Sequence, residues 1–164
     1  MVVAAVSRGG DLRTAERVNS WSGFTSHGLA TWSQVDIAIA SDGDIWFAGT
    51  KRDGRLFVRK RIGGVWSGFA IQGLATWSAD EAPAVAAYSN GVVVAAVKQD
   101  GRLYTRHQIG GVWRSFVQQG LPGWTATDIA VSANGAAWIA GVKADGRAYT
   151  VSYTHLTLPT ICSV

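Results

Sequence analysis

Residues 53–69 have the sequence DGRLFVRKRIGGVWSGF, and residues 100–116 repeat it as DGRLYTRHQIGGVWRSF. A third Asp-Gly-Arg begins at Asp145, so this tripeptide recurs at intervals of 47 and 45 residues. Two series of tryptophans recur at intervals of 45 and 47 residues: Trp21, Trp66 and Trp113, and Trp32, Trp77 and Trp124. A repeat of this length, built from short alternating strands, is typical of a β-propeller with one four-stranded blade per period.

The third unit is complete and shows the plan of one blade. The pairs Asn90-Gly91, Asp100-Gly101 and Gly110-Gly111 favour two-residue hairpin turns, because these residue types tolerate positive φ. The pairs separate four expected antiparallel strands, which are Ala82–Ser89, Val92–Gln99, Arg102–Ile109 and Val112–Gln119. The second unit has the same plan, with expected strands Val35–Ser41, Asp44–Arg52, Arg55–Ile62 and Val65–Gln72. Small residues in the inner strands suit the narrow centre of a propeller.

The units at the two ends are incomplete. The first begins at Val2 inside its second strand, and the fourth has the expected strands Thr127–Ala133, Ala136–Ala144 and the start of a third, Arg147–Thr150. The sequence therefore predicts an all-β fold over residues 1–150, a partial β-propeller with two complete and two partial blades in an open arc. The expected blades are residues 2–27, 35–72, 82–119 and 127–150. Since a closed propeller has about four to eight blades, we expect the chain to be a fragment, with its true N-terminus and any export signal upstream.

The repeat pattern ends after Thr150. Residues 151–160, VSYTHLTLPT, are similar to a translated sequencing adapter, since the codons GTC TCT TAT ACA CAT CTG ACG CTG CCG ACG encode them. We therefore interpret residues 151–164 as a tail that is not native to the protein. The alternative is a divergent C-terminal strand, because Val, Tyr and Thr favour strands. The tail contains His155, Pro159 and Cys162, the only cysteine, so no disulfide is expected in residues 1–150.

The composition argues against several classes of protein. A hydrophobic fraction of 48% and a net charge of +4 do not fit a disordered chain. The basic residues form no long run, so the pI of 9.6 is not an argument for nucleic-acid binding. No apolar stretch approaches the roughly 18 residues of a membrane span. Sequence motifs of hydrolases, metalloproteases and phosphate loops are absent, so we expect no catalytic residue, no metal site and no cofactor.

Trp32, Trp77 and Trp124 lie in the expected connectors between units, outside the strands. Two interpretations stay open for them. Each indole could fill the space between two successive blades. Alternatively, each could lie in a surface groove and offer its face to a pyranose ring, with its N–H free to donate a hydrogen bond. The expected polar partners of a sugar are then Ser33, Ser78 or Thr125, together with Asp36 and Asp128; the corresponding residue of unit 3 is Glu81 or Ala84, depending on the direction of counting.

The arginines of the Asp-Gly-Arg repeat are further candidates. Arg55 and Arg102, like Arg147, could form paired hydrogen bonds with sugar hydroxyls or a carboxylate. The alternative is that they are solvated residues at the start of a strand, next to a turn that Asp and Gly form. His27 and His107 have no second histidine or carboxylate at a spacing typical of metal ligands, so we expect structural or surface roles for both.

The complete blade resembles the bacterial propeller lectins of the Photorhabdus type and, more distantly, the fungal fucose lectins. The resemblance rests on Asp-Gly-Arg-Leu-Tyr at residues 100–104, on the fourth-strand Trp113 and on the aromatic connectors. It implies multivalent glycan binding between adjacent blades, with fucosylated or O-methylated sugars as ligands. Glu16 is the only glutamate in an expected third strand, so the Arg, Glu and aromatic set of the fucose lectins does not recur from blade to blade.

The expected function is therefore non-catalytic carbohydrate binding. It would be carried out by a secreted or cell-surface protein that is multivalent or oligomeric when intact. A second hypothesis is a structural or protein-interaction propeller within a larger secreted protein. A third is a propeller hydrolase or lyase whose catalytic blades lie outside this chain.

Overall fold

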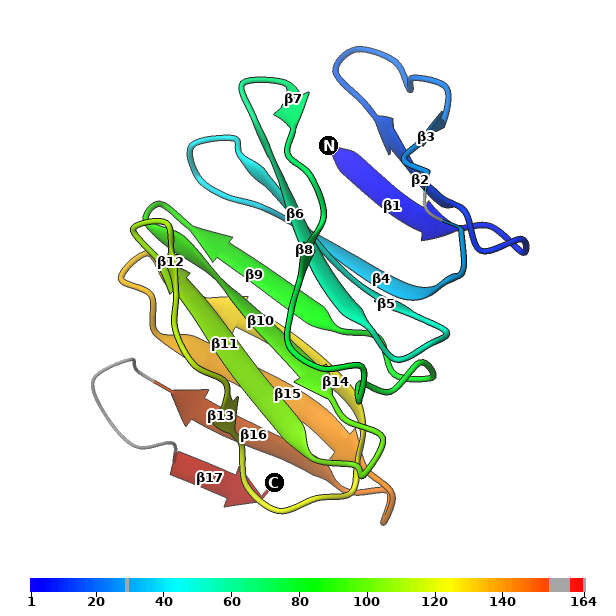
Figure 1. Ribbon diagram of the computed structural model, residues 1–164. Coiled ribbons are helices and arrows are strands. Elements are labelled where there is room, and N and C mark those ends of the chain that lie inside the picture. The colour runs from blue at the N-terminus through cyan, green and yellow to red at the C-terminus, as the bar shows by residue number, and fades with distance from the viewer. Residues whose placement is uncertain (29, 154–159, 164) are drawn as a thin grey trace.

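The chain forms four antiparallel sheets that follow one another in an arc (Figure 1). The computed structural model describes residues 1–28, 30–153 and 160–163. These residues contain strands, turns and loops, and among them no helix is long and apolar enough to cross a lipid bilayer. The prediction of an all-β, partial propeller is confirmed.

The two central sheets match the two complete blades predicted. Blade 2 consists of β4 (Trp32–Ile39), β5 (Ile45–Lys51), β6 (Leu56–Ile62), β7 (Val65–Trp66) and β8 (Ala70–Ile71). Blade 3 consists of β9 (Ala84–Tyr88), β10 (Gly91–Val97), β11 (Leu103–Ile109), β12 (Val112–Trp113) and β13 (Val117–Gln118). The inner strands are β4 and β9, and each sheet proceeds outward in chain order.

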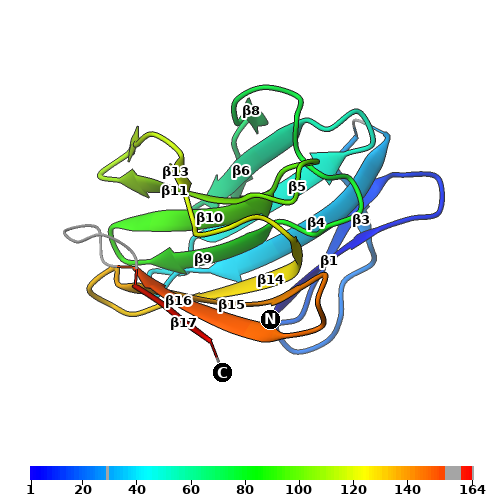
Figure 2. The ribbon, with the colours of Figure 1, turned by 90° about the horizontal axis from the view of Figure 1, so that it is seen from below.

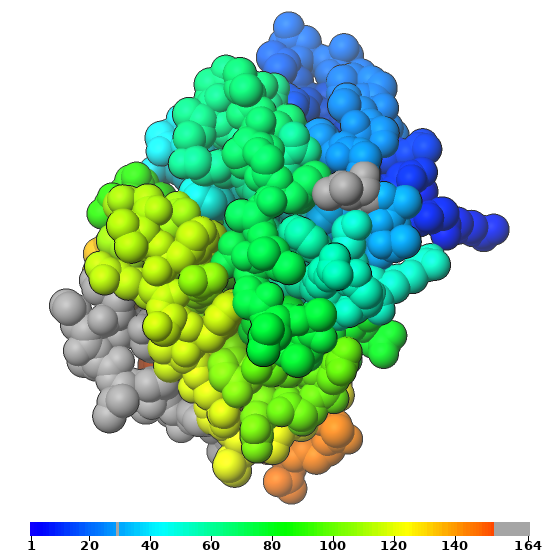
Figure 3. Space-filling model, viewed as in Figure 1, coloured from blue at the N-terminus to red at the C-terminus, as the bar shows by residue number. Residues whose placement is uncertain are grey.

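The two outer sheets are the partial blades. Blade 1 consists of β1 (Val2–Val6), β2 (Leu12–Glu16) and β3 (Thr25–Ser26). Blade 4 consists of β14 (Trp124–Val131), β15 (Ala137–Lys143), β16 (Ala148–Tyr153) and β17 (Thr160–Ser163). The inner strands β4, β9 and β14 lie next to one another in Figure 2, and β4 contacts β9 while β9 contacts β14. The space-filling view shows blades 1, 2 and 3 occupying successive parts of the visible face (Figure 3).

The fourth strand of a blade differs from its prediction as one continuous strand. In blade 2 it is divided into β7 and β8, which both pair with β6, and the three residues between them leave the ladder. The reason is visible at Ser67, whose carbonyl oxygen accepts a hydrogen bond from Arg59 Nε at 2.6 Å. Blade 3 repeats the break, with Arg106 Nε donating to the carbonyl oxygen of Arg114 at 2.6 Å. An arginine side chain thus binds a backbone group that a continuous ladder would use.

The third strand of blade 4 is longer than predicted. It was expected to end at Thr150, but β16 continues to Tyr153 and pairs with β17. The β-branched and aromatic residues of this segment suit a strand, which was the alternative interpretation of the tail. His155 and Pro159 lie outside the described residues. Whether residues 151–164 are native to the protein stays a prediction, because strand formation is compatible with either origin.

Apolar clusters fill the space between successive blades, and we call each such interface a seam. At seam 2/3, Ala48 and Val58 of blade 2 pack in one cluster with Val92 and Val94 of blade 3. At seam 1/2, Leu12 packs with Trp32 and Phe47. Seam 3/4 contains the largest cluster, with Val93, Ala95, Val97 and Leu103 against Trp124, Ile139 and Val151. Burial of these faces is the main stabilising contribution, since apolar area removed from water contributes about 25 cal/mol per Å².

Candidate functional site

The three tryptophans predicted to lie in the connectors are buried. Trp32 is 0% exposed, Trp77 is 1% exposed and Trp124 is 2% exposed. Trp32 and Trp124 begin the inner strands β4 and β14, and Trp77 forms an isolated bridge with Lys98. Their rings belong to the apolar clusters of seams 1/2, 2/3 and 3/4. The expectation of an indole face open to a sugar is thus corrected, and the alternative that each fills a seam describes where they lie.

Further contacts hold each ring in its seam. Trp77 Nε1 donates to the carbonyl oxygen of Gln72 at 2.9 Å, and Trp32 Nε1 donates to that of Gly28 at 3.3 Å. A lysine ammonium lies over each ring, 5.0–5.6 Å from its centroid: Lys51 over Trp32, Lys98 over Trp77 and Lys143 over Trp124. Each of these N–H groups and ring faces therefore already has a protein partner, apart from the Nε1 of Trp124, which has none among the described residues.

The two candidate serines bind backbone. Ser33 Oγ donates to the carbonyl oxygen of Ala79 at 2.6 Å, which joins blade 2 to the connector that precedes β9. Ser78 Oγ accepts the N–H groups of Asp80 and Glu81, each at 3.3 Å, and so closes a local turn. Thr125 Oγ1 donates to the carbonyl oxygen of Val142 at 3.1 Å. These hydroxyls hold the connectors in place, and the structure does not bring them together around one site.

Asp36 joins two blades at their inner strands. Its Oδ1 accepts the N–H of Ile37 at 2.7 Å, and its Oδ2 accepts the N–H of Val85, on β9, at 2.7 Å. Burial raises the pKa of the Asp36 carboxyl above its ordinary value, and the two N–H donors oppose this effect. The residue that corresponds to Asp36 in blade 3 is Ala84, because Asp36 pairs with Ala48 and Ala84 pairs with Ala95. Blade 3 has Ala84 at this position, which has no side-chain acceptor, and Asp36 of blade 2 accepts the N–H of Val85 instead.

Asp128 occupies the same register position in blade 4. Its Oδ1 accepts the N–H of Ile129 at 2.8 Å, as Asp36 does for Ile37, and its side chain is exposed. The two aspartates predicted to bind sugar therefore share a backbone role at the inner strands.

The arginines of the Asp-Gly-Arg repeat are part of exposed turns. Arg55 pairs with Asp53 and Arg102 pairs with Asp100, each at 3.5 Å. The Oδ1 of each aspartate also accepts the backbone N–H of its arginine, at 3.1 and 3.0 Å. These contacts favour the alternative interpretation, a strand-start residue beside a turn.

A repeated arginine arrangement was missed from the sequence. Arg59 and Arg106 occupy the same place in their third strands and lie over the fourth-strand tryptophan and phenylalanine of their own blade, 4.7–5.2 Å from the ring centroids. Each also reaches across a seam: Arg106 Nη1 donates to Gln72 Oε1 at 2.7 Å, and Arg59 Nη1 contacts His27 Nδ1 at 3.3 Å. The recurrence of these two arginines at an interval of 47 residues could have revealed the arrangement.

Blade 4 lacks this arginine. Ile139 pairs with Val151 as Phe47 pairs with Arg59, so Val151 stands at the arginine position. Gln119 is the counterpart of Gln72, and its buried Oε1 has no partner among the described residues. The departure from the repeat at residue 151 therefore leaves a buried acceptor unpaired.

Because Gln72 accepts from an arginine and Gln119 does not, replacing each by leucine should have a different cost in stability. We expect Gln72→Leu to lower the free energy of unfolding by about 1–3 kcal/mol, because it removes the acceptor of Arg106. Gln119→Leu should cost less, since its Oε1 is unpaired and the substitution loses the Nε2 bond to Thr105 Oγ1, at 2.7 Å, and a long one to the carbonyl oxygen of Val117, at 3.5 Å, but no bond to an arginine. Urea unfolding of both variants measures the two costs. Equal costs would show that the Arg106 bond contributes nothing.

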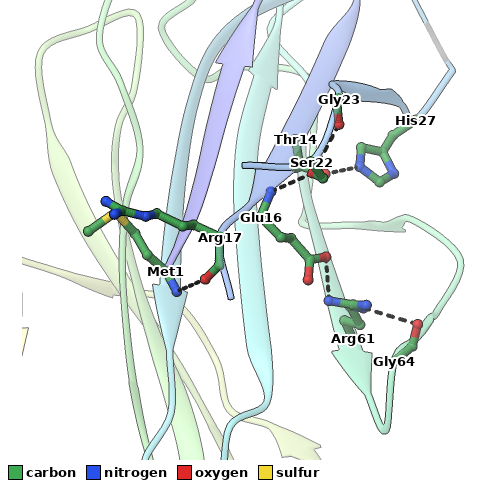
Figure 4. A network of polar contacts seen from close by, with 9 residues as sticks. All are labelled: Met1, Thr14, Glu16, Arg17, Ser22, Gly23, His27, Arg61 and Gly64. Atoms are coloured by element: carbon green, nitrogen blue, oxygen red, sulfur yellow. Dashed lines mark hydrogen bonds and ion pairs between the residues drawn. The ribbon is translucent and has the colours of Figure 1, made fainter. Parts of the chain in front are cut away.

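Polar contacts gather around Glu16 and His27, and the ion pair of Glu16 with Arg61 joins blade 1 to blade 2 (Figure 4). Glu16 Oε1 accepts from Arg61 Nη1 at 2.5 Å, and Arg61 Nε donates to the carbonyl oxygen of Gly64. His27 Nε2 lies 2.6 Å from Thr14 Oγ1. Burial, followed by the charges of Arg59 and Arg61, lowers the pKa of His27. Since the guanidinium of Arg59 can only donate, the Nδ1 of His27 accepts from it, which leaves Nε2 to donate to Thr14 Oγ1.

Two adjoining hollows lie at seam 2/3. One hollow, of about 170 Å³, has Asp42, Asp44, Asn90, Gln108, Lys60 and Trp46 among its lining residues, and we call it hollow A. A second, of about 130 Å³, includes Arg59, Lys60, Ser67, Gln108, Trp46 and Trp113, and we call it hollow B. The two adjoin, since Trp46, Lys60 and Gln108 line both. Indole rings, amides, carboxylates and cations thus meet at one place between two blades.

The chemistry of this place suits a polyhydroxylated ligand. Trp46 and Trp113 lie edge to face with centroids 6.5 Å apart and offer apolar surface. The carboxylates of hollow A can accept hydrogen bonds from hydroxyl groups, and its amides can accept or donate them. Among the described residues, no three His, Cys, Asp or Glu side chains are grouped so that they could hold a metal ion. None of the sequence-predicted site residues lines either hollow; these are Trp32, Trp77, Trp124, Ser33, Ser78, Asp36, Asp128, Arg55 and Arg102.

Known structures resemble this arc. No protein-family model matches the chain, and no curated protein matches it. The BP39L lectin from Burkholderia pseudomallei has a TM-score of 0.80 at 18% identity, over 99% of this chain and 51% of that one. A fungal lectin from Aleuria aurantia, described as a six-bladed β-propeller with a novel fucose recognition mode, has a TM-score of 0.73 at 15% identity, over 99% and 56%. The intramolecular trans-sialidase from Ruminococcus gnavus has a TM-score of 0.61 at 15% identity, over 87% and 36%. The chain therefore shares the fold of these structures and spans about half the length of the two lectins.

Proposed function

We propose that the protein binds carbohydrate, without catalysing a reaction, through hollows between adjacent blades. The observation that carries this proposal is the pair of adjoining hollows at seam 2/3, where two indoles meet amides and carboxylates. Sites that combine an apolar wall with a few convergent polar groups are typical of small-molecule binding. The likeness to two structures described as lectins supports the same function.

The repeat extends this proposal to more than one site. The hollows at seam 2/3 are lined from β5 and β6 of blade 2 and from β11 and β12 of blade 3, so further blades that repeat these residues would add further sites. Several weak sites on one rigid arc increase the overall affinity for a surface that displays many glycans. We propose accordingly that the protein acts on glycans outside the cell or at its surface.

A glycan array incubated with the labelled full chain tests the proposal. Binding to a defined group of glycans, with no turnover of the bound sugar, is the expected result. Absence of binding to every glycan would contradict the proposed function.

Trp113 provides the mutational test of the site. We expect Trp113→Ala to reduce affinity for a glycan found on the array by at least about tenfold, because it removes an aromatic wall of hollow B. Trp138→Ala is the matched control, since Trp138 is 50% exposed on β15 and lines neither hollow. Affinity can be measured by calorimetry. If Trp113→Ala binds as the unchanged protein does, the site is not hollow B.

One observation favours a second function, a structural or protein-interaction module. The face of blade 4 that carries Trp138 and Val142 is exposed, although the corresponding face of blade 2 is buried under blade 3. Ala126, Ala140 and Ala148 continue this apolar surface around a shallow hollow of about 330 Å³. A chain that binds no glycan but associates with protein through this face would have this second function.

A further inference from the structure

The charge at one repeated position differs between two seams. Glu16 pairs with Val2, as Lys60 pairs with Trp46, so Glu16 and Lys60 are the same third-strand position in blades 1 and 2. Arg61 of blade 2 lies across seam 1/2 from Glu16, and Gln108 of blade 3 lies across seam 2/3 from Lys60. Arg61 and Gln108 occupy the same position, because Arg61 pairs with Trp66 and Gln108 pairs with Trp113. Seam 1/2 therefore has an acid facing a cation, whereas seam 2/3 has a cation facing a neutral amide.

The carboxylate in seam 1/2 shows what this geometry accommodates. Glu16 and Arg61 come from different blades and form an ion pair at 2.5 Å, with side chains that are only 36% and 23% exposed. A carboxylate can thus lie between two blades at this level, bound by a cation. The protein supplies both charges there.

Seam 2/3 has the cation but no carboxylate partner for it. Within residues 1–28 and 30–152, Lys60 forms no ion pair; its ammonium lies 5.3 Å from the centroid of Trp46. Arg59 also lines hollow B, and no acidic residue does. The acids nearby, Asp42 and Asp44, line hollow A, and Asp42 Oδ1 accepts the N–H of Asp44 within their own turn. Lys60 lines both hollows, but the charged residues of hollow B are cations alone, whereas hollow A also has two acids.

We infer that the seam 2/3 site selects sugars that carry a carboxylate, such as hexuronic acids, over their neutral counterparts. The carboxylate binds beside Lys60 in hollow B, and the ring hydroxyls bind the carboxylates and amides of hollow A. This inference rests on the proposed function and adds the class of sugar. Its basis is the cation Lys60, which stands where seam 1/2 has Glu16, together with the absence of an acid among the residues that line hollow B.

Two sugars that differ only at C6 test it. Methyl α-D-galactoside and methyl α-D-galacturonoside are titrated into the full chain, and binding is followed by tryptophan fluorescence. We expect the acid to bind about tenfold more tightly at low salt, as a charge-assisted hydrogen bond provides. The preference should decrease as salt is added, because the site is partly open to solvent. Equal binding of the two sugars would overturn the inference and leave the proposed function intact, whereas binding of neither would contradict both.

Lys60→Gln identifies the residue responsible. It should remove the preference for the acid while affinity for the neutral sugar changes less than about twofold, since Gln still offers a donor. Lys143→Gln is the charge-matched control, because Lys143 lies over Trp124 at seam 3/4 and should leave the preference unchanged. Circular dichroism confirms that each variant is folded. A preference that persists in Lys60→Gln assigns selectivity elsewhere and overturns the inference.

Discussion

Trp77→Ala is expected to lower the free energy of unfolding by about 3–5 kcal/mol, the usual cost of removing a large buried aromatic side chain. Trp77 is 1% exposed and packs against Phe116 and Tyr104, with ring centroids at 4.8 and 6.1 Å. The substitution also leaves the carbonyl oxygen of Gln72 without the indole N–H that it accepts. Because domains are stable by only about 5–15 kcal/mol, this variant should be near its limit of folding.

The melting temperature measures this effect. A loss of this size should reduce it by roughly 10–15 °C for a chain of this length. Trp138→Ala is the control, since its side chain is half exposed and should cost little. The result also separates the two interpretations of the repeated tryptophans. A variant that melts like the unchanged protein but loses sugar binding would restore Trp77 as a stacking surface and would refute its role in the seam.

The turns and the blade order could be predicted because the responsible residues are adjacent in sequence. Gly54 and Gly101 have φ of +78° and +76° at the Asp-Gly turns, as the repeat indicates. Hydrogen bonds from the aspartate side chains close the same turns. Local chemistry of this kind requires no knowledge of the neighbouring blade.

The exposure of the tryptophans could not be predicted in the same way. Whether an indole in a connector is open or covered depends on the blade that packs against it, and that blade is distant in sequence. One local indication existed at Gly49, on β5. A Cβ there would lie 2.9 Å from the Trp32 ring and 2.6 Å from the Phe47 ring, so an aromatic ring covers the glycine. Gly141 stands in the same relation to Trp124, with a Cβ 2.8 Å from its ring. A glycine at this strand position thus indicates a buried indole.

The hollows at seam 2/3 were also beyond prediction, for a different reason. They arise where two blades approach without a charged pair between them, and this depends on a combination of residues across the seam. Lys60 and Gln108 are unremarkable as single residues. Only the comparison with Glu16 and Arg61, at the same positions of the preceding seam, shows that Lys60 and Gln108 cannot form the ion pair found there.

Asp36→Ala should lower the free energy of unfolding by about 1–3 kcal/mol near pH 7, because it leaves the buried N–H of Val85 without an acceptor. Alanine itself fits at this position, since Ala84 occupies it in blade 3. The cost therefore measures the hydrogen bonds to Val85 and Ile37. Asp128→Ala is the matched control: Asp128 is exposed, and its carboxylate accepts only the N–H of Ile129.

The dependence of this cost on pH has a definite sign. Burial raises the pKa of Asp36 in the folded protein above its value in the unfolded chain. The folded state therefore holds the proton more tightly, and the stability linked to that proton is fully present below the unfolded pKa and is lost as the pH rises through the folded pKa. The difference in free energy of unfolding between the unchanged protein and Asp36→Ala should consequently be larger at about pH 4 than at about pH 7. Urea unfolding at both values measures it. If the difference instead decreases at the lower pH, the two N–H donors outweigh burial, and Asp36 stabilises the seam as a carboxylate.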